Sequence, residues 1–200
     1  MAACDAQCLA VAGALLEGGA EILQYRHKGF WSRGRFQEAR EIALLCRAAA
    51  VPFVVNDRAD YTAVLNHEGI PAWLHVGQDD LSPRDARAVI GSLARLGFST
   101  HNQDQMSAAA EEPVDYVAFG PVFGTTTKEH PDPATGVAAL LYIRRITRLP
   151  LVAIGGITLE NAAECRAAGA DSVALISALI PRPFSVSAVT EKMREWQRVY

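Results

Sequence analysis

Three positively charged residues and two turns of small residues have the chemistry of phosphate sites. Arg26 and Lys28 occupy alternate positions, so in an extended segment their side chains point to the same side. An arginine fork and a lysine point charge both bind phosphate oxygens, and Lys128 adds a third cation. Gly155 and Gly156 form a glycine-rich turn, and residues 176–177 lie in a serine-containing turn, and both kinds of turn occur beside phosphates. These residues predict the binding of more than one phosphate.

Two aspartates have the placement of a magnesium site. Asp57 and Asp80 each follow an apolar run that is predicted to be a strand, and neighbouring strands lie about 4.8 Å apart. Two carboxylates, with waters and substrate phosphates completing the shell, suit Mg²⁺ better than zinc. No pair of histidines or cysteines in the sequence has zinc-ligand spacing. We therefore predict that Asp57 and Asp80 bind one Mg²⁺ ion.

Each of these residues also has an ordinary structural interpretation. The alternatives are a solvated loop pair for Arg26 and Lys28, a helix cap for Asp57, a turn without a ligand for Gly155 and Gly156, and packing for His75, His101, Cys46 and Cys165. For Tyr25, Phe30 and Trp31 the sequence favours neither packing nor a rim over a pocket. The regular placement of polar groups after successive apolar runs favours a functional site.

The elements that hold these residues alternate between strands and helices, which predicts a parallel sheet with right-handed crossovers. The predicted strands are residues 21–25, 53–56, 73–76, 97–99, 116–119, 151–154 and 172–175. The predicted helices are residues 8–16, 36–49, 83–90, 103–111, 138–147 and 159–168. Ser82 and Thr158 are predicted to begin helices, and Gly169 to end one.

The strand spacing predicts a (β/α)₈ TIM barrel whose first strand is missing or degenerate. The six steps from Glu21 to Ser172 average about 25 residues, so eight need the whole chain of 200. A doubly wound sheet is less favoured, because no GxGxxG opens the first helix. Residues 1–7 are too few and too weakly apolar for the first strand, so we expect an incomplete barrel there and a true start upstream. Residues 1–200 are predicted to be one domain, with its chemistry at the carboxyl ends of the strands.

Composition excludes several classes of protein. The formal net charge is −3, which provides no basic field for nucleic acid, and no apolar run is long enough to span a membrane. The four cysteines form neither a CxxC nor a paired framework, which indicates a reducing cytoplasm. Whether the chain forms a homo-oligomer is left open.

The order of the motifs resembles that of the thiamine phosphate synthase family. Any one motif is weak evidence for the family, but the series is specific. It begins with Gln-Tyr-Arg-x-Lys and Asn-Asp, and it continues with Gly-Pro, an apolar residue, an aromatic residue, threonines and a lysine. The resemblance covers about residues 18–179. The segments that carry it are residues 24–28, 56–58, 75–80, 98–101, 120–128, 154–157 and 176–178.

The resemblance implies a transferase of thiamine biosynthesis. That family joins 4-amino-5-hydroxymethylpyrimidine diphosphate to a thiazole phosphate, or its carboxylate form, and releases pyrophosphate. The pyrimidine–oxygen bond breaks first, and the thiazole nitrogen captures the resulting cation. Mg²⁺ is the implied cofactor, and the two small molecules are the implied partners.

The family's functional residues map onto positions of this sequence. Those implied for the pyrimidine diphosphate are Gln24, Arg26, Lys28, Asn56, Ser99 and Lys128. Of these, the implied catalytic residues are Arg26, Lys28, Ser99 and Lys128. Tyr25 and His27 lie in the same segment as Gln24, Arg26 and Lys28 and are further substrate-binding candidates. Those implied for the thiazole phosphate are Thr125, Thr126, Thr127, Gly156, Ile176 and Ser177. The implied metal ligands are Asp57 and Asp80.

Three departures from the family pattern leave alternatives. His27 replaces an acidic residue, residues 66–73 form a longer segment expected to reshape the approach to Asp80, and the first strand is not evident. One rival is a thiazole tautomerase of the same superfamily, which would carry a histidine in place of Pro121. The other is a barrel that binds thiazole or thiamine phosphates without turnover.

Overall fold

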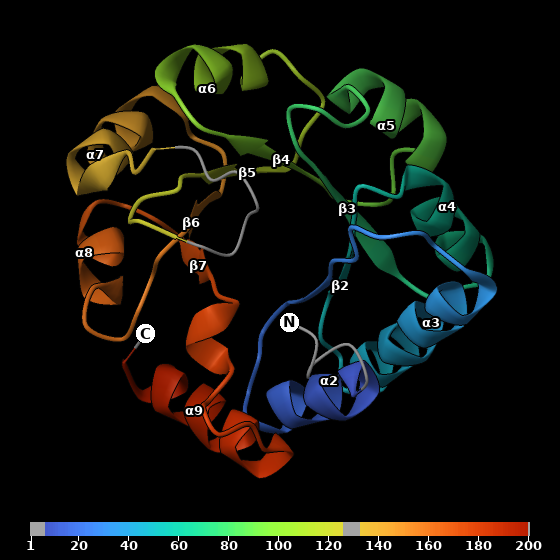
Figure 1. The fold of residues 1–200 in the computed structure, drawn as a ribbon. Coiled ribbons are helices and arrows are strands. Elements are labelled where there is room, and N and C mark those ends of the chain that lie inside the picture. The colour runs from blue at the N-terminus through green and yellow to red at the C-terminus, as the bar shows by residue number, and fades with distance from the viewer. Residues whose placement is uncertain (1–6, 126–132, 200) are drawn as a thin grey trace. The chain divides into compact units, whose positions relative to one another are not determined.

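The computed structural model describes residues 7–125 and 133–199, and the chain forms two compact α/β units. The first comprises Met1–His75, Ala88–Ala94 and Leu179–Arg198, and the second Val76–Arg87, Arg95–Ala178 and Val199–Tyr200. In each unit, parallel strands alternate with helices along the chain (Figure 1). Among the described helices, none is long and apolar enough to cross a membrane.

The first unit contains the strands that carry one predicted aspartate and two of the three predicted cations, Arg26 and Lys28. Its parallel order is β1-β2-β3, with Tyr25 opposite Val55 and Asn56 opposite His75. Its elements are α2 (Cys8–Glu17), β1 (Leu23–Tyr25), α3 (Arg33–Ala48), β2 (Phe53–Asn56), α4 (Ala59–His67), most of β3 (Ala72–Val76) and nearly all of α9 (Val186–Val199).

The second unit contains the predicted glycine-rich phosphate turn. Its strands are parallel in the order β4-β5-β6-β7. Its elements are most of α5 (Pro83–Ile90), β4 (Leu96–Thr100), α6 (Gln103–Ala109), β5 (Tyr116–Phe119), α7 (Gly136–Ile146), β6 (Leu151–Ile154), α8 (Ala162–Ala167), β7 (Ser172–Ala174) and the start of a 3₁₀ turn, η1 (Ser177–Leu179).

All seven predicted strands are confirmed, with their ends shifted by no more than two residues. The parallel α/β fold is therefore confirmed, whereas closure into a (β/α)₈ barrel and a single domain stay predictions. The prediction for residues 1–7 falls almost wholly outside the described residues; Gln7 lies in a bend. The helices α4 and α9 are additions to the predicted set.

Helix ends follow local hydrogen bonding. Ser82 begins α5 as predicted, because its hydroxyl accepts the Asp85 N–H at 3.2 Å and donates to the Asp85 carboxylate at 2.6 Å. Gly169 ends α8 as predicted, with a φ of +93°. The helix predicted from residue 159 begins later, because Asn161 accepts the Thr158 N–H at 2.8 Å and holds residues 158–161 in a turn.

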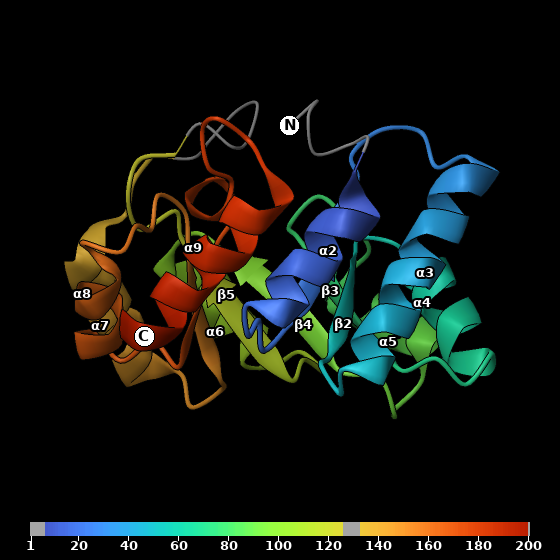
Figure 2. The same cartoon turned by 90° about the horizontal axis from the view of Figure 1, so that it is seen from below.

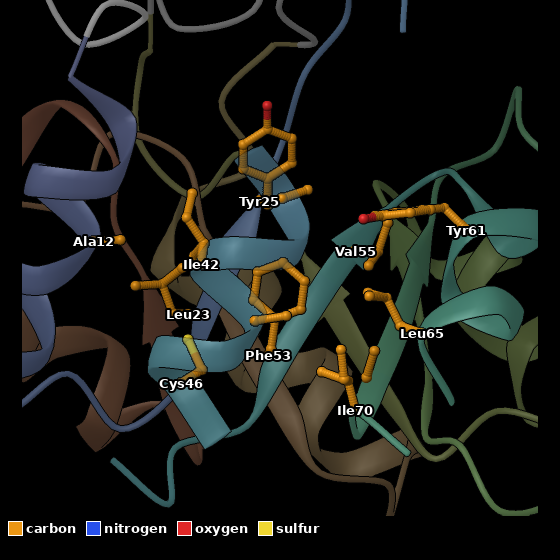
Figure 3. Packing of buried hydrophobic residues seen from close by; sticks show 13 residues of the cluster. Ala12, Leu23, Tyr25, Ile42, Cys46, Phe53, Val55, Tyr61, Leu65 and Ile70 are labelled. Atoms are coloured by element: carbon orange, nitrogen blue, oxygen red, sulfur yellow. The ribbon is translucent and has the colours of Figure 1, made fainter. Parts of the chain in front are cut away.

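The core of the first unit forms where α3 and α4 pack on β1 and β2 (Figure 3). Ile42 and Cys46 lie one helical turn apart on α3 and are fully buried against Phe53 and its strand. From α4, Leu65 enters the same cluster. The two helices bury Phe53 and Val55 on this face of β2, and Val54 and Asn56, which point to the opposite face, are buried as well.

On another side of the first unit, α2 packs against α9, and the two helices lie side by side in Figure 2. Gly18 allows this approach, since a Cβ there would come within 2.9 Å of the Thr190 carbonyl oxygen. An ion pair of 2.8 Å joins Arg194 to Glu17.

Burial of Cys46 makes stability depend on pH. It raises the pKa of the Cys46 thiol from its ordinary value of 9.0 to about 11. Above pH 9 the unfolded chain releases this proton first, so the free energy of unfolding falls as the pH rises towards 11. We expect Cys46→Ala to weaken this fall by up to about 1.4 kcal/mol per pH unit. Urea unfolding of both proteins under reducing conditions, at several values from pH 8 to 10, measures how the free energy of unfolding changes with pH. Equal slopes of this free energy against pH for the two proteins would contradict the prediction.

Candidate active site

One group of predicted site residues lies where β1 and β2 end, within the first unit. Along β1, Tyr25 is buried while Gln24 is exposed, and the alternation continues to Arg26, which is half-buried. Because β1 and β2 are parallel and in register, both strands deliver the residues that follow them to the same edge. Lys28 accordingly forms an ion pair with the Asp57 carboxylate. The structure thus brings a predicted phosphate-binding cation to a predicted metal ligand.

Asp57 has an unusual backbone. Its φ is +65°, in the left-handed region, which costs a residue other than glycine about 1–2 kcal/mol. The Asp57 N–H donates to the His75 carbonyl oxygen of β3 at 2.8 Å, which ties this conformation to the neighbouring strand. The N-cap of α4 is Arg58, one residue after Asp57. Strained backbone conformations cluster at active sites, so this one makes Asp57 a candidate functional residue.

Asn56 presents a buried amide nitrogen with no hydrogen-bond partner. Its side chain is 6% exposed, and its Nδ2 is one of three buried side-chain atoms without a hydrogen bond among the described residues. A buried donor left unpaired costs about 1–3 kcal/mol. The Asn56 amide therefore has donor capacity for an acceptor supplied from outside the chain.

A second group of predicted site residues follows β3 and β4, within the second unit. Asp80 is half-buried, and its Oδ2 accepts the Gly77 N–H at 2.8 Å. Gln78 donates from Nε2 to the Ser99 carbonyl oxygen at 2.6 Å. These bonds fix the turn that carries Asp80 and hold it to the end of β4, where Ser99 was predicted to contact substrate.

Gly155 and Gly156 allow a close approach between two segments, besides forming the turn that their sequence indicated. Both have positive φ, and a Cβ on Gly156 would come within 2.8 Å of Phe123 and closer still to the Gly124 carbonyl oxygen. The Phe123 N–H donates to the Gly155 carbonyl oxygen at 3.1 Å. The glycines let the segment before Thr125 pack directly on the end of β6.

We expect Gly156→Ala to lower the free energy of unfolding by about 2–4 kcal/mol, because it adds backbone strain and overpacking. Gly69→Ala is the matched control: its φ is +74°, but its Cβ would meet no atom within 4 Å. That control should lose only about 1–2 kcal/mol. Urea unfolding compares the two, and equal losses would show that the contact with Phe123 and Gly124 is unimportant.

The remaining candidates for the thiazole phosphate lie in several places. Thr125 is half-buried, Ile176 is exposed, and Ser177 begins the 3₁₀ turn η1. Thr126, Thr127 and Lys128 lie outside the described residues.

Tyr25 and His27 stay predictions as substrate-binding residues, and both side chains make contacts within the chain. The Tyr25 hydroxyl donates to Glu38 at 2.5 Å, and burial raises the pKa of this hydroxyl above its ordinary range. The His27 Nε2 lies 3.2 Å from the Phe30 carbonyl oxygen, and its ring stands edge-on to Trp31. The period of two that points Gln24 and Arg26 to one side places these rings on the other.

The longer segment at residues 66–73 is closed by one of its own side chains. The Asn66 side chain donates to the Ala72 carbonyl oxygen at 2.9 Å and accepts the Ala72 N–H at 3.0 Å. This closes the segment at the start of β3, whereas Asp80 follows the end of that strand. The effect of this segment on the approach to Asp80 stays a prediction.

The structural interpretation of the histidines is supported. His75 is buried within β3, and the His101 Nδ1 donates to the Gly120 carbonyl oxygen at 2.5 Å. Cys46 and Cys165 are fully buried, as packing residues are. Sequence reasoning missed Arg58, which lies beside Asp57 and stacks on Trp31. The only signal for it was its position directly after the Asn-Asp pair.

Comparison with known proteins places the chain in a family. The family model described as thiamine monophosphate synthase matches residues 1–179. The chain belongs to the thiamine monophosphate synthase family. The resemblance stated from its motifs is thereby confirmed.

Curated relatives and a solved structure agree with this family. A thiamine-phosphate synthase of Koribacter versatilis is 45% identical over 169 residues, 84% of this chain and 78% of the relative. Another, of Chloroflexus aurantiacus, is 40% identical over 185 residues, 92% of this chain and 83% of the relative. A thiamine phosphate pyrophosphorylase from Pyrococcus furiosus has a similar fold, with a TM-score of 0.82 and 26% identity, covering 96% of this chain and 88% of that one. The chain is therefore similar to thiamine monophosphate synthase family members over most of its length.

Proposed function

We propose that this chain is a thiamine-phosphate synthase. It joins 4-amino-5-hydroxymethylpyrimidine diphosphate to a thiazole phosphate and releases pyrophosphate. The observation that carries the proposal, beside the family, is the ion pair of Lys28 with Asp57 next to the unpartnered amide of Asn56. These three groups provide a cation for phosphate oxygens, a carboxylate for a metal ion and a donor for a neutral acceptor.

The donor set fits Mg²⁺. Among the described residues, no three histidines, cysteines, aspartates or glutamates lie close enough together to hold a metal ion by themselves. Mg²⁺ needs no such group, because it keeps waters and substrate phosphates as ligands. Asp57 and Asp80 supply the carboxylates, and the strained backbone of Asp57 supports a ligand role. When bound, Mg²⁺ neutralises negative charge on the diphosphate.

The chain's own cations act on the leaving group. Arg26, Lys28 and Lys128 stabilise the negative charge that grows on the diphosphate as the pyrimidine–oxygen bond breaks. Gln24 and Asn56 orient the pyrimidine diphosphate, and Ser99 completes its contacts. Thr125, Thr126 and Thr127, with the backbone at Gly156, Ile176 and Ser177, hold the thiazole phosphate.

Such a reaction needs no strong general base. The thiazole nitrogen is already a nucleophile, so the protein has to position it and exclude water. His101 and His75 are engaged in packing, in agreement with chemistry that does not use them. Pro121, buried where a tautomerase would carry a histidine, favours the synthase over that rival.

Incubation of the protein with both substrates and Mg²⁺ tests the proposal. We expect equal amounts of thiamine phosphate and pyrophosphate, and neither product when one substrate or Mg²⁺ is omitted. Isomerisation of thiazole carboxylate phosphate without the pyrimidine substrate would instead identify a tautomerase. Tight binding of both substrates without any product would identify a binding protein.

A further inference from the structure

A stacked arginine adjoins the proposed metal ligand. The Arg58 guanidinium lies 5.1 Å from the centre of the Trp31 ring and 5.0 Å from that of Phe36. Asp60 holds this guanidinium by two bonds, Nε to Oδ1 at 2.8 Å and Nη2 to Oδ2 at 2.5 Å. A guanidinium held by a carboxylate over two aromatic faces has little freedom to move.

Trp31 in turn holds the segment that carries the cations. Its indole N–H donates to the His27 carbonyl oxygen at 3.2 Å, between Arg26 and Lys28. Its ring packs on Tyr25 of β1, with centroids 5.6 Å apart, and on Tyr61 of α4, with centroids 5.7 Å apart. The indole thereby connects the start of this segment to α4.

The contact between Arg58 and Trp31 therefore links two segments distant in the sequence. One carries Arg26 and Lys28, and the other carries Asn56 and Asp57. We propose that Arg58 and Trp31 are positioning residues, which set the geometry of Lys28 against Asp57. Neither touches the substrate in this proposal, which rests on the function proposed above and names a further requirement of the same site.

A surface arginine with an ordinary ion pair provides the matched control. Arg40 pairs with Glu68 at 2.9 Å, and no stacking contact joins it to the segment of Lys28 among the described residues. If Arg58 acts only through general stability, then Arg58→Met and Arg40→Met should have similar effects. If it positions the site, only Arg58→Met should alter the segment of residues 26–30.

Amide hydrogen exchange of the free protein tests the link directly. Arg58→Met and Trp31→Leu should each speed exchange in residues 26–30, although Arg58 lies outside that segment. Arg40→Met should leave this exchange unchanged. Because no substrate is present, this result stands or falls independently of the proposed activity. Unchanged exchange in folded Arg58→Met would overturn the proposal.

Kinetics test the consequence for the reaction. Arg58→Met should lower kcat/KM for the pyrimidine diphosphate by about 10- to 100-fold, as is typical when groups that orient a metal site are lost. The KM for thiazole phosphate should change little. The double variant with Trp31→Leu should be no worse than the poorer single variant, because both break the same link. Fully additive losses, or losses equal for both substrates, would contradict a positioning role.

A milder variant covers the case in which Trp31→Leu fails to fold. Trp31→Phe keeps an aromatic face for Arg58 but removes the N–H that donates to His27. It should speed exchange in residues 26–30 less than Arg58→Met does, and Arg58→Lys should fall between Arg58→Met and the unaltered protein. If Trp31→Phe and Arg58→Lys both exchange as fast as Arg58→Met, the stack does not position this segment.

Discussion

Asp57→Asn is expected to lower kcat by at least about 100-fold, since even the outer partners of a metal site are worth ~10–100-fold. One carboxylate holds Mg²⁺ less well than two, and the amide that replaces it carries no charge. The fold should survive, because asparagine tolerates the left-handed φ of +65° better than most residues. Asp80→Asn should cause a loss of the same order.

The measurement is initial rate against Mg²⁺ concentration, with unfolding curves for each variant. Asp79→Asn is the control, since Asp79 is exposed and immediately precedes Asp80. It should retain full activity. Full turnover by Asp57→Asn and Asp80→Asn at ordinary Mg²⁺ concentrations would contradict the assignment of both residues as metal ligands.

Arg26→Ala should slow the chemical step by about 10²–10³-fold, the range found when one group that stabilises a transition-state charge is removed. Arg26 forms no ion pair with the residues that the structure describes, so its charge is available to a ligand. Lys128→Ala should act in the same direction. The KM for thiazole phosphate should stay nearly constant, because the charge grows on the other substrate.

Single-turnover experiments with excess enzyme separate this effect from product release. Arg33→Ala is the control, because Arg33 is exposed at the start of α3. An unchanged chemical rate with a raised KM for thiazole phosphate would instead place Arg26 at the second phosphate.

The sequence by itself determined the alternation of strands and helices and the end of each strand at which polar residues gather. These features follow from local rules: apolar runs form buried strands, and the period of two separates Arg26 from Tyr25. The motif series also identified the family. Local rules placed the start of α8 too early, because the Asn161 side chain bonds back to Thr158 and delays the helix.

Only the tertiary structure decided how these residues are held. The Lys28–Asp57 pair joins residues 29 positions apart, and the Asp57 backbone conformation depends on a carbonyl of β3. The unpartnered Asn56 amide and the packing of Gly156 on Phe123 likewise depend on distant segments. Such contacts leave no periodic or compositional signal, because they are set by which segments the fold brings together. The stack of Arg58 on Trp31 also depends on distant segments, because it forms where α4 packs beside α3.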